Sequence, residues 1–191
     1  MKAILLFSIV ALLFCACSNT TPKTGTDAAQ SKQNVIEMTN DMENAAEVIP
    51  SWINEKTVIA TNQPAAHSGN YACVTNDTIE YGYGYMEQIK NIIPGLPKYV
   101  LVTGWIYSTA PKPDFAVVLD INENNIPYDW LAVPLADSLT TTGKWVHFNA
   151  GFYFSKPLNP EQHIKIYTWN QSKKAVYIDD LNIRFEYQEI K

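Results

Sequence analysis

The sequence predicts an all-β domain, an antiparallel β-sandwich of the jelly-roll type, and three observations support this prediction. Short apolar runs alternate with period two and are separated by Gly, Pro and Asn residues. No long segment has a helical period, and no repeat of about 20–50 residues indicates a propeller or a solenoid. Aromatic residues make up 12% of the chain, which suits pleated sheets.

The predicted strands follow one another along the chain after residue 35. The most apolar are 99–107 and 115–121, and Pro and Asn residues mark the turns around them. The full set of strand-like segments is 35–38, 57–60, 71–74, 79–89, 99–107, 115–121, 128–135, 145–148, 164–170 and 176–183. About eight to ten strands of ordinary length fit in a domain of roughly 150 residues.

The last third of the chain predicts the sheet faces most clearly. The apolar sets that we expect to face the core are Val146/Phe148, Ile164/Ile166, Val176/Ile178 and Leu181/Ile183. The alternate positions carry Lys165, Tyr167 and Trp169, which therefore point away from the core. An outer sheet face with exposed rings is a natural platform for a ligand.

The N-terminus is typical of an exported lipoprotein. Lys2 precedes an apolar run, residues 3–14, that is too short to span a bilayer as a permanent helix. Ala16-Cys17 resembles the processing box of bacterial lipoproteins, and Cys15 fits less well because bulky Phe14 precedes it. We predict that residues 1–17 are a signal peptide ending at the lipidated Cys17, which carries acyl chains such as palmitate. An ordinary signal peptide cut nearby is the alternative.

Lipid chains on Cys17 would tether the protein to a membrane. Residues 18–36 are polar and without apolar periodicity, so we predict a flexible linker there. The segment after Cys17 lacks an acidic cluster of the kind that resembles a surface-export signal. We therefore expect a lipid anchor in the outer membrane on the periplasmic side, with surface exposure left open.

Charge and cysteine content restrict the partners. The net charge is -5 and no basic run occurs, which argues against nucleic acid as a partner.

Cys73 is the one cysteine of the mature domain, so an internal disulfide is excluded, and we predict a small buried hydrophobe at this position. We expect a monomer, with other cell-envelope proteins as further partners left open.

Five motifs, in order, resemble the β-jelly-roll carbohydrate-binding modules of the galactose-binding-like superfamily. They are Asp41-Met42-Glu43-Asn44 with Trp52, Ser68-Gly69-Asn70-Tyr71-Ala72, Tyr99 to Tyr107, Gly143-Lys144-Trp145, and Val176 to Leu181. The resemblance covers residues 37–187, the predicted sandwich domain, and leaves 188–191 as a C-terminal tail. It implies the fold more strongly than it implies sugar binding.

The resemblance also implies a structural calcium ion at the edge of the sandwich. The matching ligand positions here are Glu43 and Asp180. Two carboxylates would need backbone carbonyls and water to complete a calcium shell. The alternative is that both are solvated residues at strand ends.

Aromatic and amide residues supply the candidate ligand-binding set. Sugar C–H faces stack on exposed rings, and amides fix the hydroxyl groups. Tyr at positions 81, 83 and 85 would place three rings on one face of a strand. The candidates are Tyr83, Tyr85, Tyr128, Trp130, Tyr167, Trp169 and Asn170, while Trp52, Trp105 and Trp145 are expected to pack.

The sequence gives no support for an enzyme. Asp179 and Asp180 are adjacent, so on a regular strand they would point to opposite faces and could not flank one glycosidic bond. His67, His147 and His163 lack metal-ligand spacing. We therefore predict a non-catalytic, membrane-tethered module that holds a glycan or polysaccharide. The alternatives are a structural or protein-interaction lipoprotein with the same sandwich and, more weakly supported, a glycosidase.

Overall fold

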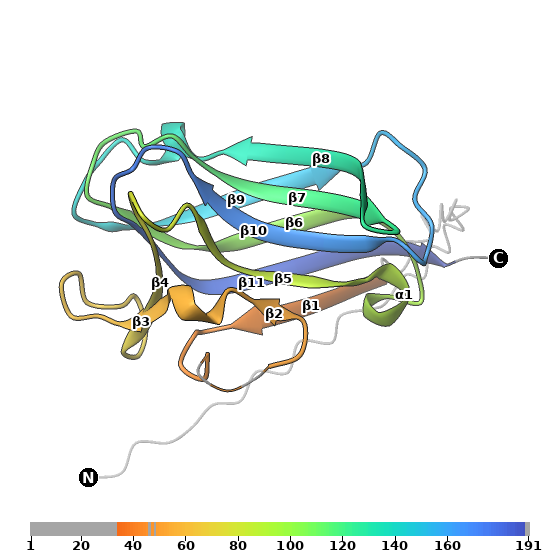
Figure 1. Cartoon of the computed structure of the whole chain (residues 1–191), viewed down its shortest axis with the longest axis horizontal. Helices are drawn as coiled ribbons and strands as arrows, with labels where there is room; N and C mark the ends of the chain where they lie inside the picture. Colours follow the sequence, from red (N-terminus) through yellow and green to blue (C-terminus); the bar gives the residue numbers. More distant parts are fainter. Residues whose placement is uncertain (1–33, 46, 48, 190–191) are drawn as a thin grey trace, which may run out of the picture. The chain divides into compact units, whose positions relative to one another are not determined.

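Two antiparallel sheets form the fold in the computed structural model, which describes residues 34–45, 47 and 49–189 (Figure 1). One sheet has the strand order β3-β4-β11-β6-β9, with β1 also paired to β11, and the other has the order β2-β5-β10-β7-β8. The first sheet contains β1 (Asn34–Asn40), β3 (Val58–Ala60), β4 (Tyr71–Thr75), β6 (Gly95–Ser108), β9 (Trp145–Tyr153) and β11 (Val176–Glu189). The second contains β2 (Trp52–Ile53), β5 (Tyr81–Gln88), β7 (Phe115–Glu123), β8 (Ile126–Pro134) and β10 (His163–Asn170). The all-β sandwich prediction is confirmed.

Helical structure in the described residues is limited to short turns. One α-helical turn, α1 (Ile89–Ile92), follows β5, and two 3-10 turns cover Glu55–Thr57 and Ala136–Ser138. No helix among the described residues is long and apolar enough to cross a membrane.

The core lies between the two sheets and contains the apolar positions expected from the alternation. Ile164 and Ile166 of β10 face Ile178, Ile183 and their neighbours of β11, and all are buried. Phe148 is buried too, and Val146 packs against the core while partly exposed. Burial of such side chains stabilises a fold by about 1.5–3 kcal/mol each. The predicted core faces of the last third of the chain are therefore confirmed.

Cys73 is buried in this core, as expected. Its Sγ accepts a hydrogen bond from the backbone N–H of Tyr83 at 3.1 Å and lies 3.4 Å from the Thr57 hydroxyl. Burial is the largest cause that raises the pKa of the Cys73 thiol, which keeps it neutral and unreactive.

The folded region extends beyond the predicted domain limits of 37 and 187. β1 begins at Asn34, within the predicted linker, because Asn34, Val35 and Ile36 pair with β11. β11 ends at Glu189, within the predicted tail. The predicted signal peptide, the lipidated Cys17 and most of the predicted linker lie outside the described residues.

Candidate functional site

The outer face of the five-stranded sheet carries a group of aromatic side chains from three neighbouring regions of the chain. Trp130 comes from β8, Tyr167 and Trp169 come from β10, and Tyr81 comes from the start of β5. Tyr167 pairs with Val118 of β7. The neighbouring outward rows on the two sides of this pair contain Trp130, which pairs with Asp120, and Trp169, which pairs with Ala116. We call these four residues the ring face.

The rings of this group contact one another. Trp130 and Trp169 meet edge to face, with ring centroids 5.7 Å apart and an interplanar angle of 84°. The indole N–H of Trp130 donates to the Tyr167 hydroxyl at 3.4 Å, and Tyr81 meets Tyr167 at 5.8 Å and 65°. Edge-to-face contacts of this kind fix the direction of each ring. Trp130 and Tyr81 remain 48% and 49% exposed, so the ring face is open to solvent.

Small residues lie beneath and between these rings. Val118 is fully buried although it occupies an outward position of β7, because the surrounding rings cover it. Gly84 lies opposite Tyr167, where a Cβ atom would come within 2.2 Å of the Ile166 carbonyl oxygen. Gly84 therefore lets β5 approach β10 closely beside the Tyr167 ring.

Polar groups surround the rings. The Trp169 indole N–H donates to Glu80 Oε1 at 2.7 Å, and Lys165 Nζ lies 4.9 Å from the centre of the Tyr167 ring. Asp120 lies between Trp130 and Lys165 in the cross-strand row. Burial, opposed by the hydrogen bond from Trp130, raises the pKa of Tyr167, so its hydroxyl stays neutral. A neutral hydroxyl can both donate and accept a hydrogen bond.

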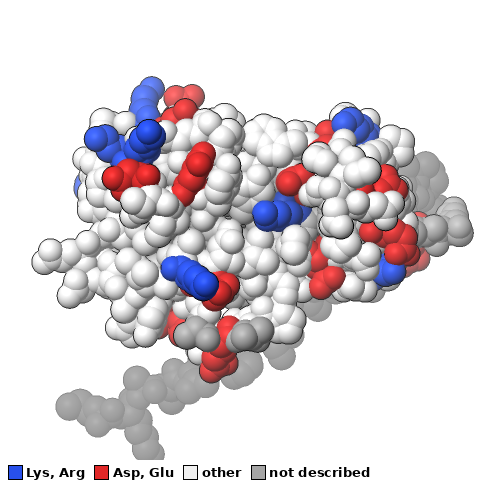
Figure 2. Space-filling model, viewed as in Figure 1, with Lys and Arg blue, Asp and Glu red and all other residues white. Residues whose placement is uncertain are grey.

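Charged side chains of both signs lie beside the rings, among them Lys165, Glu80 and Asp120. Figure 2 shows the side of the molecule on which β8, β7, β10 and β5 lie in front; Lys, Arg, Asp and Glu gather at its two ends, and basic and acidic side chains also lie near its middle.

Tyr83 and Tyr85 are not part of this surface, so the prediction that they present exposed rings is wrong. Tyr83 is 1% exposed and Tyr85 is 6% exposed, and both belong to the core. The period-two spacing does place these two on one face, but that face points inward. Tyr81 points outward because the pairing of β5 with β10 shifts register between Tyr167 and Trp169 and leaves an extra residue in β5.

Two further predicted ligand residues have structural roles. Asn170 is 2% exposed, and its amide bonds to the Thr75 hydroxyl, the Lys174 carbonyl and Ser172, so the prediction that it contacts ligand is wrong. Tyr128 is the extra residue at a register shift between β7 and β8. Its hydroxyl donates to the Pro157 carbonyl and its ring packs against the core, away from the ring face.

The acidic pair predicted for calcium holds a loop. Glu43 Oε1 accepts hydrogen bonds from the backbone N–H groups of Asn70 and Tyr71, both at 2.9 Å. Asp180 Oδ1 accepts from the Ser68 hydroxyl at 2.7 Å, and Asp180 Oδ2 lies 2.6 Å from His67 Nδ1. No group of three or more His, Cys, Asp or Glu in residues 34–45, 47 and 49–189 could hold a metal ion. The donors around Glu43 and Asp180 do not fit a calcium site, in which these oxygens would face the cation.

Asp179 and Asp180 face the same loop, contrary to the expectation of opposite directions. Asp179 Oδ2 accepts from the backbone N–H of His67 at 2.8 Å and of Ser68 at 3.1 Å. The register of β11 against β6 shifts between Asp179 and Asn182, and Asp180 has a positive φ of 51°. This bulge turns Asp180 toward the partners of Asp179.

The predicted packing role of the other Trp residues agrees with their contacts. Trp52 stacks on Tyr83, and Trp105 stacks on His67 with centroids 3.9 Å apart. The Trp145 indole N–H donates to the Ala65 carbonyl at 3.0 Å. Sequence reasoning missed Tyr81 as a member of the ring face, since only the register shift separates it from Tyr83 and Tyr85.

Comparison with solved structures supports the fold. The chain is similar to the tandem CBM22-1–CBM22-2 domain of Xyn10C from Paenibacillus barcinonensis, with a TM-score of 0.53 and 14% identity over 83% of this chain. The chain spans 48% of that tandem protein, about half its length.

Two single modules match with TM-scores below 0.5. The CBM22-1 xylan-binding domain of the same enzyme matches at 0.47, 15% identity, and coverage of 82% of this chain and 97% of that one. A family 22 module of Clostridium thermocellum Xyn10B matches at 0.47, 14% identity, and coverage of 81% and 94%. At these identities the similarity shows the fold alone. No protein-family model and no curated protein matches the sequence.

Proposed function

We propose that this protein is a non-catalytic module that binds a glycan or polysaccharide on the ring face and is tethered to a membrane by acyl chains on Cys17. The observation that carries the proposal is the contacting group of Trp130, Tyr167 and Trp169 on the outer sheet face, in which Trp130 is exposed and Tyr167 and Trp169 are half-buried. Stacking of sugar C–H faces on such rings, with hydroxyl groups directed by neighbouring polar atoms, is a general mode of sugar recognition.

The geometry supports an extended ligand. The four rings come from β8, β10 and β5, so a ligand that contacts all of them crosses several strands of the sheet. The Tyr167 hydroxyl, Lys165 and Asp120 lie beside the rings and can bond to sugar hydroxyls. The similarity in fold to a tandem of CBM22 domains supports the same assignment.

The ring face is tested by affinity electrophoresis of the full chain in gels that contain xylan, β-1,4-galactan, β-glucan or mannan. The Trp130→Ala/Trp169→Ala double variant is expected to lose at least about tenfold in affinity, equivalent to about 1.4 kcal/mol, because it removes two stacking rings. Its melting temperature should fall only slightly, since Trp130 is 48% exposed.

Tyr153→Ala is the matched control. Tyr153 is 76% exposed on β9 of the other sheet, so its loss removes a ring without touching the ring face. Two outcomes would favour the alternative of a structural or protein-interaction lipoprotein. One is that the gels retard the native chain and the double variant equally, and the other is that no gel retards the native chain.

A further inference from the structure

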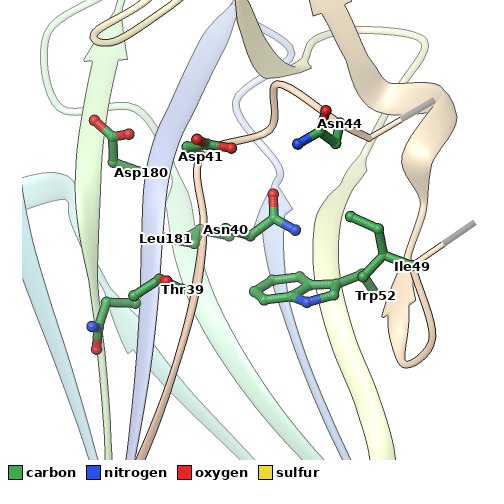
Figure 3. A pocket seen from close by; sticks show the side chains of 9 residues that line it. Thr39, Asn40, Asp41, Asn44, Ile49, Trp52, Asp180 and Leu181 are labelled. Atoms are coloured by element: carbon green, nitrogen blue, oxygen red, sulfur yellow. The ribbon is translucent and has the colours of Figure 1, made fainter. Parts of the chain in front are cut away.

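A pocket lies at the end of β1, at the edge of the sandwich (Figure 3). The pocket has a volume of about 460 Å³. Among its lining residues are Thr39, Asn40 and Asp41 of the β1 end, Asn44, Trp52 of β2, and Asn182 of β11. Pockets that bind small molecules in proteins have volumes of about 300–1,000 Å³, and this one is at the smaller end of that range.

Trp52 gives the pocket a fixed aromatic wall. Its ring is stacked on buried Tyr83, with centroids 5.4 Å apart and an interplanar angle of 7°. Tyr85, also buried, meets it edge to face at 5.5 Å. Within the described part of the chain, the Trp52 indole N–H has no hydrogen-bond partner. The pocket therefore contains a ring held in one orientation by the core.

Amide groups stand around this ring. In the view of Figure 3 the Asn40 amide lies between the Trp52 ring and the Asn44 side chain. Asn40 is fixed, because its Oδ1 accepts from the Met42 N–H at 2.8 Å and its Nδ2 donates to the Tyr83 hydroxyl at 3.1 Å. Asn182 lies opposite Thr39 in the β1–β11 pair. Among residues 34–45, 47 and 49–189, the Asn182 side chain has no hydrogen-bond partner, although it is only partly exposed.

The charges at the pocket are negative only. Asp41 and Asp180 contribute to the lining, and within the described residues no Lys, Arg or His does. Asp180 is engaged with Ser68 and His67. Asp41 Oδ1 accepts from the Glu43 N–H, and within the described residues Asp41 Oδ2 has no donor. An anionic ligand would meet the Asp41 carboxylate, which has no basic partner among the lining residues, whereas a neutral polyhydroxylated ligand would find the Trp52 ring, amide donors and acceptors, and one carboxylate acceptor.

We infer that this pocket binds a single neutral sugar residue, as a free monosaccharide or as the end of a chain. The pocket and the ring face are separate, since Trp52 belongs to β2 at one edge of the five-stranded sheet and Trp130 belongs to β8 at the other edge. The inference stands on its own residues and does not require that the ring face bind a glycan.

The test is titration of the full chain with the methyl glycosides of glucose, galactose, mannose and xylose, followed by calorimetry and by tryptophan fluorescence. At least one of these neutral sugars is expected to bind, and methyl glucuronide should bind at least tenfold more weakly. Asn182→Ala should weaken binding of that neutral sugar by at least fivefold without unfolding the protein, because its side chain has no partner in the described part of the chain. Trp52→Phe, which keeps a ring, should weaken it less than Trp52→Ala.

Asn149→Ala is the matched control, because Asn149 and Asn182 both pair with Thr103 in one cross-strand row but Asn149 does not line the pocket. The Trp130→Ala/Trp169→Ala variant should bind the monosaccharide as the native chain does, which separates this site from the ring face. No binding of any neutral sugar overturns the inference. Equal loss in the Asn149→Ala variant, equal loss in the ring-face variant, or equally tight binding of methyl glucuronide would also overturn it.

Discussion

At the scale of single residues, Asp179 makes the stability of the protein depend on pH. It is completely buried, and burial is the largest cause that raises its pKa from 3.8 to about 6, against the backbone hydrogen bonds that lower it. The folded state therefore binds the proton more tightly than the unfolded state. The stabilisation that comes from protonation of the buried Asp179 carboxyl is complete below about pH 4 and is lost as the pH rises through 6.

We predict that the Asp179→Asn variant lacks this pH dependence, because an amide does not titrate. The free energy of unfolding of the native chain, measured in urea from pH 4 to pH 7, should fall relative to that of the variant by an amount on the order of 2 kcal/mol. If the free energy of unfolding of the native chain minus that of the variant stays constant or increases from pH 4 to pH 7, Asp179 is not the source of the pH dependence.

Residue alternation predicted which side chains share a face, but it predicted the direction of that face only where one set was clearly apolar. Tyr167 and Trp169 alternate with Ile164 and Ile166, so the hydrophobic effect decides their outward direction. Tyr83 alternates with glycine, and neither set is the obvious core. The tyrosine rings fill the core there, which no spacing rule could show.

At the scale of strands and loops, register shifts explain most of the differences from prediction. The extra residue in β5 separates Tyr81 from Tyr83, and the extra residue in β8 isolates Tyr128. A third shift, in β11, turns Asp180 toward His67. A bulge depends on which strand lies alongside, so a single sequence gives little indication of it.

The segment from His67 to Tyr71 is held by carboxylates, and this leads to a prediction about metal ions. Gly69 has a φ of +55°, and a Cβ atom there would lie 2.2 Å from Glu43 Cδ, so the loop closes directly on the Glu43 carboxylate. Since two backbone N–H groups already bond to Glu43 Oε1, a calcium chelator should leave the melting temperature unchanged. Glu43→Ala should instead destabilise the fold by about 1 kcal/mol, because two exposed backbone N–H groups exchange a carboxylate acceptor for water.

Glu55→Ala is the control for this loop, since Glu55 is an exposed glutamate in a 3-10 turn. Thermal unfolding with and without chelator, and after addition of calcium, measures the effect. A melting temperature that falls with chelator and recovers with calcium would restore the predicted metal site.

At the scale of the folded domain, the outer faces of the two sheets differ in whether a loop covers their aromatic rings. The six-stranded sheet has rings as well, but the loop that contains Ala65 and His67 binds Trp145 and covers Trp105. The Trp130 ring contacts residues of its own sheet and keeps 48% of its surface open. The sequence predicted rings on the outer surface but could not show which sheet a distant loop would cover.

The charge of the whole chain gives the last prediction, which concerns ionic strength. The chain has 19 acidic and 14 basic residues, so its net charge of -5 repels polyanions. The ring face would hold a neutral ligand mainly by ring stacking, with Lys165 and Asp120 of opposite charge beside the rings. Salt at 0.1 M largely screens interactions between exposed charges that are more than about 10 Å apart, whereas it does not screen ring stacking. Affinity for a retained neutral polysaccharide should therefore change less than about twofold between about 20 mM and about 500 mM NaCl, and polygalacturonate should not be retained at either concentration. Retention of polygalacturonate at low salt that is lost at high salt would mean that charge, and not ring stacking, selects the ligand.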